Sequence, residues 1–540
     1  MENLNKIYKE WRPTILIGAG IFILAFALRL YNLTILPVFG DEAIYIRWAQ
    51  VMGAEPGLRF LPLSDGKQPL FMWVLMFLVR RFSDPLFIGR LTSVFYGMGT
   101  LIGIFALTYY LFKSPPTHKV SAGQARKIAL IASLFWAISP YSVFFDRTAL
   151  VDSMLAMFGV WTLFFAIVTV KTLRLDMAMM AGFTLGGALL TKSPALFFVL
   201  MLPVTWMVSR WPKRRFVHLI KLGFLSLVTA AIGYGLYNIL RLGPNFHLIT
   251  SRNQDYVYPI SQIWTSPFNP LITNVTSSFN WLWFMGPSIL VLFVLIALVS
   301  NLKIEYIKTD KKSRSEVALL FIWSAFPLAV SAVYAKVFTA RYILFILPTV
   351  YIFASIIFLK LYKKKEIVKK GLILGLILYI ALALRIDYLL LTDPENANLP
   401  RVMRSGYLEE WTSGTGIREV ADLIRGEYTL EPDKKIVVGT EGFFGTLPDA
   451  LQAYLNDLPE ITVIGVGVPI REVPIQLIES KQAGNKTYLV VNSTRFLGDG
   501  EELGLELAAV YPKAFRPDGS RESLYLFVVT QQALNLKKSP

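Results

Sequence analysis

Residues 13–45 read PTILIGAGIFILAFALRLYNLTILPVFGDEAIY, an apolar stretch that leads into the two acids Asp41 and Glu42. No charged residue interrupts positions 13–28, and the apolar stretch reaches Leu33. That length approaches the roughly 20 residues that a helix needs to cross the hydrocarbon of a membrane. The stretch lacks the small residues of a signal-peptide cleavage site, so we predict a retained span. Carboxylates beside a membrane are costly and commonly functional, which makes this acid pair our first candidate for an active site.

The whole chain has the composition of a polytopic membrane protein. Of its 540 residues, 54% are hydrophobic and 17% are charged, which excludes an ordinary soluble enzyme. The net charge of +17 is uneven: residues 1–391 hold 39 Lys and Arg against 16 Asp and Glu, and the remainder holds 15 against 21. A basic excess confined to the membrane part sets topology, so we predict no nucleic-acid partner. The chain has no cysteine, which excludes disulfides, thiolate metal sites and a cysteine nucleophile.

We predict about 11 membrane helices from the apolar segments of the first 391 residues. With the N-terminus in the cytoplasm, every large basic cluster falls in an inner loop, as the positive-inside rule requires. The prediction is therefore a multi-pass protein of the cell membrane. The approximate segments are 13–33, 86–112, 128–145, 148–170, 177–190, 194–210, 217–238, 281–301, 316–335, 342–361 and 371–391.

Two further parts of the chain are predicted to lie on the outer side. Residues 34–85 form a long loop, in which segment 69–80 is too short to span and fits an interfacial helix. From residue 392 the pattern becomes that of a soluble domain, which eleven crossings place outside the cytoplasm. We therefore predict a transmembrane catalytic domain at 1–391 and an extracytoplasmic α/β domain at 392–540. Its expected elements are a helix at 419–425 and strands at 435–439, 461–466, 487–492 and 523–530.

This topology gathers acidic and basic residues near the outer membrane surface. The acids could act as a general base, and the cations could bind a phosphate leaving group. Asp146 and Asp152 would face different directions on an ideal helix, so we predict a break near Asp146 and Arg147. The gathered residues are Asp41, Glu42, Lys67, Asp146, Arg147, Asp152, Lys192, Lys336 and Arg341.

Each of these groups also has an ordinary structural interpretation. An acid at the start of the loop could cap an interfacial helix. Lys67 and Lys192 could extend toward the lipid headgroups. Asp152 could be bonded within the bundle, and Asp146 with Arg147 could form a local ion pair. We favour a functional role for the acids at the start of the loop, for the two lysines and for Asp152. For Asp146 and Arg147 we leave both interpretations open.

Four motifs occur in the order seen in GT-C glycosyltransferases. They are Gly40–Tyr45 (GDEAIY), Gly66–Trp73 (GKQPLFMW), Asp146–Asp152 (DRTALVD) and Leu190–Ala195 (LTKSPA). Over about residues 10–390 the chain resembles the branch that contains protein O-mannosyltransferases and the bacterial aminoarabinose transferase of lipid A. The resemblance implies a GT-C-like helical membrane fold. It also implies transfer of a sugar from a polyprenyl phosphate to an extracytoplasmic protein, lipid or envelope glycan, with inversion and without a covalent intermediate.

The resemblance also implies roles for the acids. Asp41 matches the family's first-loop acid and would be the general base, with Glu42 orienting the acceptor or Asp41 itself. Asp152 matches the acid that follows the third span in relatives. Which of Asp41 and Asp152 takes the proton stays open, and Tyr45 and Asp146 are included as further site residues.

The cations would complete a pocket for the donor phosphate. Lys67 matches the Lys of the family's Lys-Pro element, although Gln68 intervenes before Pro69. Lys192 matches the Lys of a Thr-Lys-Gly element in which Ser193 replaces Gly. The late Arg-Tyr element corresponds to Arg341 and Tyr342, and Arg147 joins these phosphate-binding candidates.

No cofactor is expected. The chain has three histidines, His118, His218 and His247, and the first two are predicted to lie inside. We therefore expect no His-rich metal site and a metal-independent reaction, with a divalent metal left open.

A transporter or flippase of lipid-linked intermediates is the main alternative, but it predicts repeated halves, and we find none. A scaffold whose outer domain binds cell-surface polymers is a third possibility. The expected partners are the polyprenyl-phosphate sugar, the acceptor and membrane lipids.

Overall fold

The chain folds into two compact units. The computed structural model describes residues 2–113, 122–286, 311–362 and 366–536. The first unit comprises Met1–Tyr31, Phe60–Phe71 and Leu91–Asp393. The second unit comprises Asn32–Arg59, Met72–Arg90 and Pro394–Pro540. The second unit thus joins the C-terminal part of the chain to much of the predicted outer loop, whereas the sequence suggested a division near residue 391.

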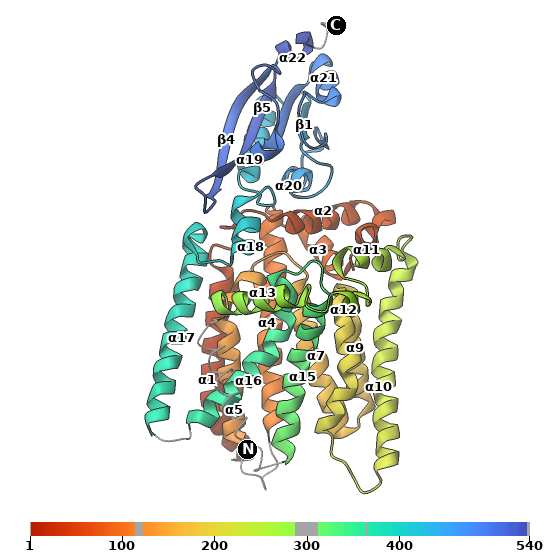
Figure 1. The fold of residues 1–540 in the computed structure, drawn as a ribbon, viewed down its shortest axis with the longest axis vertical. Helices are drawn as coiled ribbons and strands as arrows, with labels where there is room; N and C mark the ends of the chain where they lie inside the picture. Colours follow the sequence, from red (N-terminus) through yellow and green to blue (C-terminus); the bar gives the residue numbers. More distant parts are fainter. Residues whose placement is uncertain (1, 114–121, 287–310, 363–365, 537–540) are drawn as a thin grey trace. The chain divides into compact units, whose positions relative to one another are not determined.

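The first unit is a bundle of apolar helices. Figure 1 shows α1, α5, α16 and α17 as neighbouring rods, and their contacts agree. The helices α3 (Leu70–Leu78) and α4 (Pro85–Phe112) have residues in both units. The other elements are α1 (Glu2–Leu30), η2 (Leu61–Asp65), α5 (Ala122–Ala137), α6 (Pro140–Asp146), α7 (Asp152–Thr172), α8 (Leu175–Thr191), η4 (Ser193–Ala195), α9 (Leu196–Met201), η5 (Leu202–Val208), α10 (Arg215–Tyr237), η6 (Asn238–Leu242), α11 (Leu248–Tyr256), α12 (Gln262–Thr265), α13 (Leu271–Phe284), α15 (Lys311–Tyr334), η8 (Ala340–Ile346), α16 (Leu347–Tyr362) and α17 (Glu366–Thr392).

The protein is a multi-pass membrane protein. Within the described ranges, seven helices are long and apolar enough to cross a membrane, or eight if one bent pair forms a single span. The bent pair is α5 with α6, which meet at 61° before Pro140, because proline cannot continue a helix through its own position. The predicted segments 177–190 and 194–210 are shorter helices. Most of the predicted segment 281–301 falls outside the described residues.

The second unit contains a five-stranded sheet with the order β2-β1-β3-β5-β4. The strands β1 (Ile436–Thr440), β2 (Ile461–Gly465) and β3 (Lys486–Asn492) are parallel, and β5 (Arg521–Val529) joins β3 to β4 (Leu505–Phe515) in antiparallel pairing. The predicted α/β domain is therefore confirmed. The other elements are α2 (Gly40–Ala54), η1 (Pro56–Leu58), η3 (Val79–Arg81), η9 (Pro394–Asn396), α18 (Arg401–Arg404), η10 (Ser405–Glu409), α19 (Ile417–Leu430), α20 (Thr446–Tyr454), α21 (Ile475–Gln482), η11 (Ser493–Arg495) and α22 (Gln531–Leu536).

Within the second unit, helix α2 is attached to the C-terminal part of the chain. The backbone N–H of Gly40 donates to the carbonyl of Thr412 over 3.0 Å, and that of Gly414 donates to Val38 over 2.8 Å. Further along α2, Gln50 Nε2 donates to the carbonyl of Ala453 in α20 over 2.9 Å. The segment that carries the predicted general base is thus fixed by residues far away in sequence.

Candidate functional site

A buried ion pair lies at the centre of the candidate site. Asp152 is the first residue of α7, and Lys192 occupies the break between α8 and η4. The Lys192 Nζ atom lies 2.6 Å from Asp152 Oδ1. The other carboxylate oxygen, Asp152 Oδ2, is buried and has no hydrogen-bond partner within the described ranges. A buried acceptor without a donor is costly, so this oxygen has a free position for a hydrogen-bond donor.

Two further cations lie around this pair. Arg341 and Tyr342 belong to η8, which packs against α7. The Tyr342 ring centroid lies 4.1 Å from Lys192 Nζ and 5.4 Å from Arg341 Cζ. Lys67 Nζ lies 2.6 Å from the hydroxyl of Tyr256. Two tyrosines therefore contact three of the four lysine and arginine side chains that the sequence predicts for phosphate binding.

The charges of these cations act on one another. Burial lowers the pKa of Lys192 to about 8; Asp152 opposes this change, whereas Arg341 and Lys67 reinforce it. Lys192 lies outside the helices long enough to span. Mutual repulsion among cations is relieved when an anion binds between them. The first unit therefore presents a cluster of positive charge in which Lys192 is paired with Asp152.

The loops that carry Lys67 and Lys192 are bonded to each other. Gln68 Nε2 donates to Ser193 Oγ over 2.8 Å. Gly66 precedes Lys67 with a φ of +68°, and a Cβ there would lie 2.7 Å from Arg252 Cβ. Glycine is therefore required both by the backbone conformation and by the lack of space. Gln68 and Ser193, which depart from the family pattern, are the residues that join the two loops.

Asp41 and Tyr45 lie on α2 in the second unit. Asp41 is half-buried in the first turn, and Tyr45 is buried one turn later. Carboxylates are favourable at a helix N-terminus, where backbone N–H groups are unpaired. The roles predicted for both residues stay predictions.

Glu42 has extensive structural contacts. Its carboxylate is fully buried, and its two oxygens accept from Arg90 Nε and Nη2 over 2.9 and 2.8 Å. Glu42 Oε2 also accepts from the backbone N–H of Phe39 over 3.0 Å, which caps α2. Arg90 donates in addition to the carbonyls of Leu33, Leu36 and Pro37. These contacts favour a role in shaping the loop before Asp41 over contact with an acceptor.

The Arg90→Met substitution should destabilise the second unit by about 3–5 kcal/mol, because it leaves the Glu42 carboxylate buried without its cation. Thermal unfolding of the purified protein in detergent would show this as a lower midpoint. Arg174→Met, which breaks the exposed pair with Asp176, is the matched control and should change little. An Arg90→Met protein that unfolds like the parent would contradict the structural role of this pair.

Asp146 and Arg147 take part in a separate buried network. Asp146 Oδ2 accepts from Arg29 Nε over 2.8 Å, and its Oδ1 accepts from Ser153 Oγ over 2.7 Å. Arg147 Nη1 donates to the carbonyls of residues 28, 29 and 31, where α1 ends. The break predicted at this point is confirmed, since α6 ends at Asp146 and α7 begins at Asp152. Three backbone carbonyls thus take up the Arg147 Nη1 donor, and the phosphate-binding role predicted for Arg147 stays a prediction.

Several residues of the site were not identified from the sequence. Tyr256 is the last residue of α11, and nothing near it in the sequence signals a contact with Lys67. Arg29 and Arg90 are arginines within or beside apolar helices, and such ionisable residues are functional or paired by default. Their place in the sequence therefore predicts a buried acidic partner for each, and the structure shows Asp146 and Glu42 in that position.

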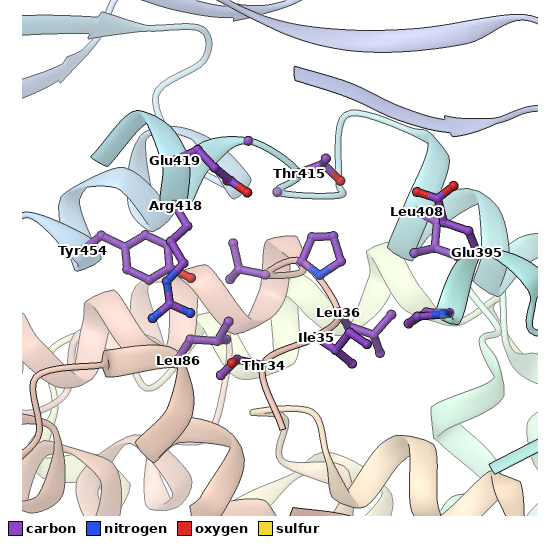
Figure 2. Close-up of a pocket in the computed structure, with 15 residues that line it drawn as sticks. Thr34, Ile35, Leu36, Leu86, Glu395, Leu408, Thr415, Arg418, Glu419 and Tyr454 are labelled. Atoms are coloured by element: carbon purple, nitrogen blue, oxygen red, sulfur yellow. The ribbon is translucent and has the colours of Figure 1, made fainter. Parts of the chain in front are cut away.

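The second unit has a cavity of about 280 Å³ beside the loop that leads to Asp41. Figure 2 shows Arg418 and Tyr454 on one side of it and Glu395 on the other. The Arg418 guanidinium lies 2.5 Å from Asp84 Oδ2, so its charge is already paired. The cavity therefore does not offer the unpaired positive charge that a phosphate needs.

Comparison with known proteins identifies the fold. No protein-family model and no curated protein sequence matches the chain. Among solved structures, the chain is similar to ArnT from Cupriavidus metallidurans in the apo state, with 13% identity, a TM-score of 0.56, and coverage of 98% of this chain and 99% of that one. The same protein bound to undecaprenyl phosphate gives 14% identity, a TM-score of 0.57, and coverage of 97% and 99%. The chain therefore has the GT-C-like fold of ArnT, a polytopic helical membrane protein with a C-terminal α/β domain, as the sequence predicted.

Proposed function

We propose that the protein is an integral-membrane glycosyltransferase that moves a sugar from a polyprenyl phosphate to an acceptor outside the cytoplasm. The observation that carries the proposal is the cluster of positive charge in which Lys192, paired with the buried carboxylate of Asp152, interacts with Lys67 and Arg341. The solved structure of ArnT with undecaprenyl phosphate supports it, because that protein shares this fold and holds a lipid phosphate.

The cations would bind the donor phosphate and stabilise it as it leaves. Charge develops on this group when the bond between the anomeric carbon and the phosphate oxygen breaks. Positioned Lys and Arg donors are worth more in a site that excludes water than at a surface. Because three cations supply this stabilisation, the proposed reaction needs no metal ion.

Asp41 is the proposed general base. The acceptor hydroxyl oxygen attacks the anomeric carbon from the face opposite the phosphate, its proton passes to the Asp41 carboxylate, and polyprenyl phosphate leaves with the bonding electron pair. One bond forms as one breaks, so the configuration inverts. Asp152 is less suited to this task because its carboxylate is bonded to Lys192. We assign Asp152 to orienting Lys192 and to accepting a hydroxyl of the donor sugar through Oδ2.

We further propose that the N-terminus is cytoplasmic and that the C-terminal domain and the site face the outer side. The basic loops of the sequence support this orientation through the positive-inside rule. The acceptor, whether protein, lipid or envelope glycan, would then approach from outside.

The test is to supply the protein in lipid nanodiscs with a polyprenyl-phosphate sugar and candidate acceptors. The expected result is acceptor-dependent release of polyprenyl phosphate together with a glycosylated product of inverted configuration. The flippase alternative makes a different prediction in sealed vesicles, namely movement of the intact donor between leaflets. Donor movement without any cleavage of the sugar–phosphate bond would rule out the transferase.

Donor binding should weaken as the pH rises through about 8, the pKa of Lys192. Below this pH the lysine is charged and binds phosphate, and above it the charge is lost. A sugar phosphodiester keeps one negative charge over roughly pH 7–9.5. A loss of affinity of about tenfold over this range would therefore come from the titration of a group on the protein and not on the ligand. Bound phosphate raises the pKa of the lysine, so the affinity begins to fall at about pH 8 and levels off only at the higher pKa of the complex. Lys192→Arg stays charged and should remove the dependence, and an unchanged parent affinity over this range would contradict the assignment.

A further inference from the structure

The carboxyl ends of the parallel strands in the second unit meet in one set of loops. In the order β2-β1-β3, the strand β2 lies on one side of β1 and β3 lies on the other. The connection from β2 to β3 therefore crosses β1. Ligands bind open α/β sheets in the crevice outside the carboxyl ends of the strands at such a switch point. The loops are joined by bonds from Gly442 N to Gly467 O over 2.9 Å and from Leu497 N to Ile470 O over 2.8 Å.

Aromatic rings are exposed on and beside these loops. Phe443 and Phe444, on the loop after β1, are 75% and 49% exposed, and Trp411, in the segment before α19, is 37% exposed. The Trp411 ring lies against the loop after β1, since a Cβ on Gly445 would be 3.8 Å from it. Large aromatic side chains are usually buried, so a group of exposed rings indicates a surface that contacts another molecule.

A guanidinium group covers one face of Trp411. Arg495 Cζ lies 3.7 Å from the centroid of the Trp411 ring. The acid closest to it is Glu441, at 3.6 Å, whose oxygens accept from the side-chain and backbone nitrogens of Asn492 over 2.8 and 2.7 Å. Within the described ranges the Arg495 guanidinium donates no hydrogen bond, and its side chain is 22% exposed. A stacked arginine is thus held in place with its N–H donors available.

These loops adjoin the face of α2 that carries Asp41. Asp41, Tyr45 and Trp48 recur at spacings of four and three residues and share one helix face. Trp48 stacks on Phe444 with ring centroids 5.8 Å apart. At the start of α2, a Cβ on Gly40 would lie 3.0 Å from Thr446 Oγ1. Contacts therefore join α2, the helix that carries the proposed base, to the loop with the exposed rings, and Figure 1 shows α20 above α2.

We infer that Trp411, Phe443, Phe444 and Arg495 form a carbohydrate-binding surface, which we call the aromatic loop surface. Flat aromatic rings pack against the C–H faces of sugar rings, and the adjacent guanidinium can donate to hydroxyl, carboxylate or phosphate oxygens. A lipid surface would also accept the rings and pair with the arginine, but the ordered acid and amide beside it, Glu441 and Asn492, suit sugar hydroxyls better than anionic headgroups. The assignment of this sugar as part of the acceptor rests on the proposed function; the binding itself does not.

Binding is tested with the full-length protein in nanodiscs on an array of neutral, carboxylate-bearing and phosphate-bearing oligosaccharides. We expect retention of one of these classes, and a loss of affinity of about tenfold or more in Trp411→Ala and Phe444→Ala. Arg495→Gln should weaken anionic glycans more than neutral ones. Leu430→Ala, which removes another exposed side chain, and Lys435→Gln, at the amino end of β1, are the matched controls and should bind like the parent.

A label provides a second measurement that does not require removal of Trp411. The chain has no cysteine, so Phe443→Cys can carry one fluorophore at a unique position. We expect bound oligosaccharide to change its emission, whereas a quencher attached to lipid chains should leave it unchanged. Quenching from the lipid with no response to any oligosaccharide would overturn the inference in favour of a membrane contact.

The two proposals fail separately. Sugar transfer with an unchanged KM for the acceptor in Trp411→Ala, and no glycan retained on the array, would overturn the aromatic loop surface and leave the transferase intact. Retained glycan that depends on Trp411, with no transfer from any polyprenyl-phosphate sugar, would support the surface and reject the transferase.

Discussion

The Asp41→Asn protein is expected to transfer sugar ~10²–10⁴-fold more slowly than the parent, the range over which a positioned general base contributes. Asparagine keeps the shape of the side chain but cannot take the proton from the acceptor hydroxyl. Donor affinity should be unchanged, because the proposed phosphate site lies on Lys67, Lys192 and Arg341. The measurement is single-turnover transfer at saturating donor, with donor binding determined separately.

The matched control is Glu55→Gln, which removes an exposed carboxylate at the other end of α2 and should not change the rate. Asp152→Asn separates the two candidate bases. We expect it to weaken donor binding as well as turnover, because Asp152 is bonded to Lys192. Normal transfer by Asp41→Asn, with a pure loss of turnover in Asp152→Asn, would reassign the base to Asp152.

Lys192→Met is expected to lower kcat/KM for the donor by ~10²–10³-fold, comparable to the loss of one donor in an oxyanion-binding site. The substitution removes a charge from the leaving phosphate and leaves the Asp152 carboxylate buried without its cation. The measurement is donor-dependent initial rates together with direct binding of undecaprenyl phosphate. Arg241→Met, which removes an exposed cation at the end of η6, should leave both unchanged.

A double substitution separates binding from folding in this experiment. Asp152→Asn combined with Lys192→Met has no unpaired buried charge, so it should regain stability relative to Lys192→Met alone. Phosphate binding should not recover, since the cation is still missing. Full recovery of donor binding in the double variant would show that Lys192 acts only as a partner of Asp152.

The sequence was informative where a single segment determines the structure. Apolar length predicted the long spans, and the six-residue spacing of Asp146 and Asp152 predicted the break between α6 and α7. Patterns of β-branched residues identified β1, β2, β3 and β5. The edge strand β4 was missed, because three of its residues are Ala and it contains Pro512, a residue compatible with strands mainly at sheet edges.

The contacts of the site could not be read from the sequence, because they join residues remote along the chain. Glu42 and Asp41 are adjacent acids, yet Glu42 meets Arg90 across 48 positions. Likewise Lys67 meets Tyr256 across 189 positions, and nothing local distinguishes that tyrosine from others. Motif order nominated Asp152 and Lys192 separately, but only the folded chain shows that they form one ion pair.

The attachment of α2 to the sheet domain has a practical consequence for exchanging parts between related enzymes. A graft that replaces residues 394–540 alone would cut the bonds from Gly40 to Thr412 and from Gln50 to Ala453. The part of the chain that has to be exchanged is therefore discontinuous. It includes residues 32–59 and 72–90 as well as the C-terminal part. A chimera that takes all three segments from one protein would keep the proposed base together with the residues that surround it in the second unit.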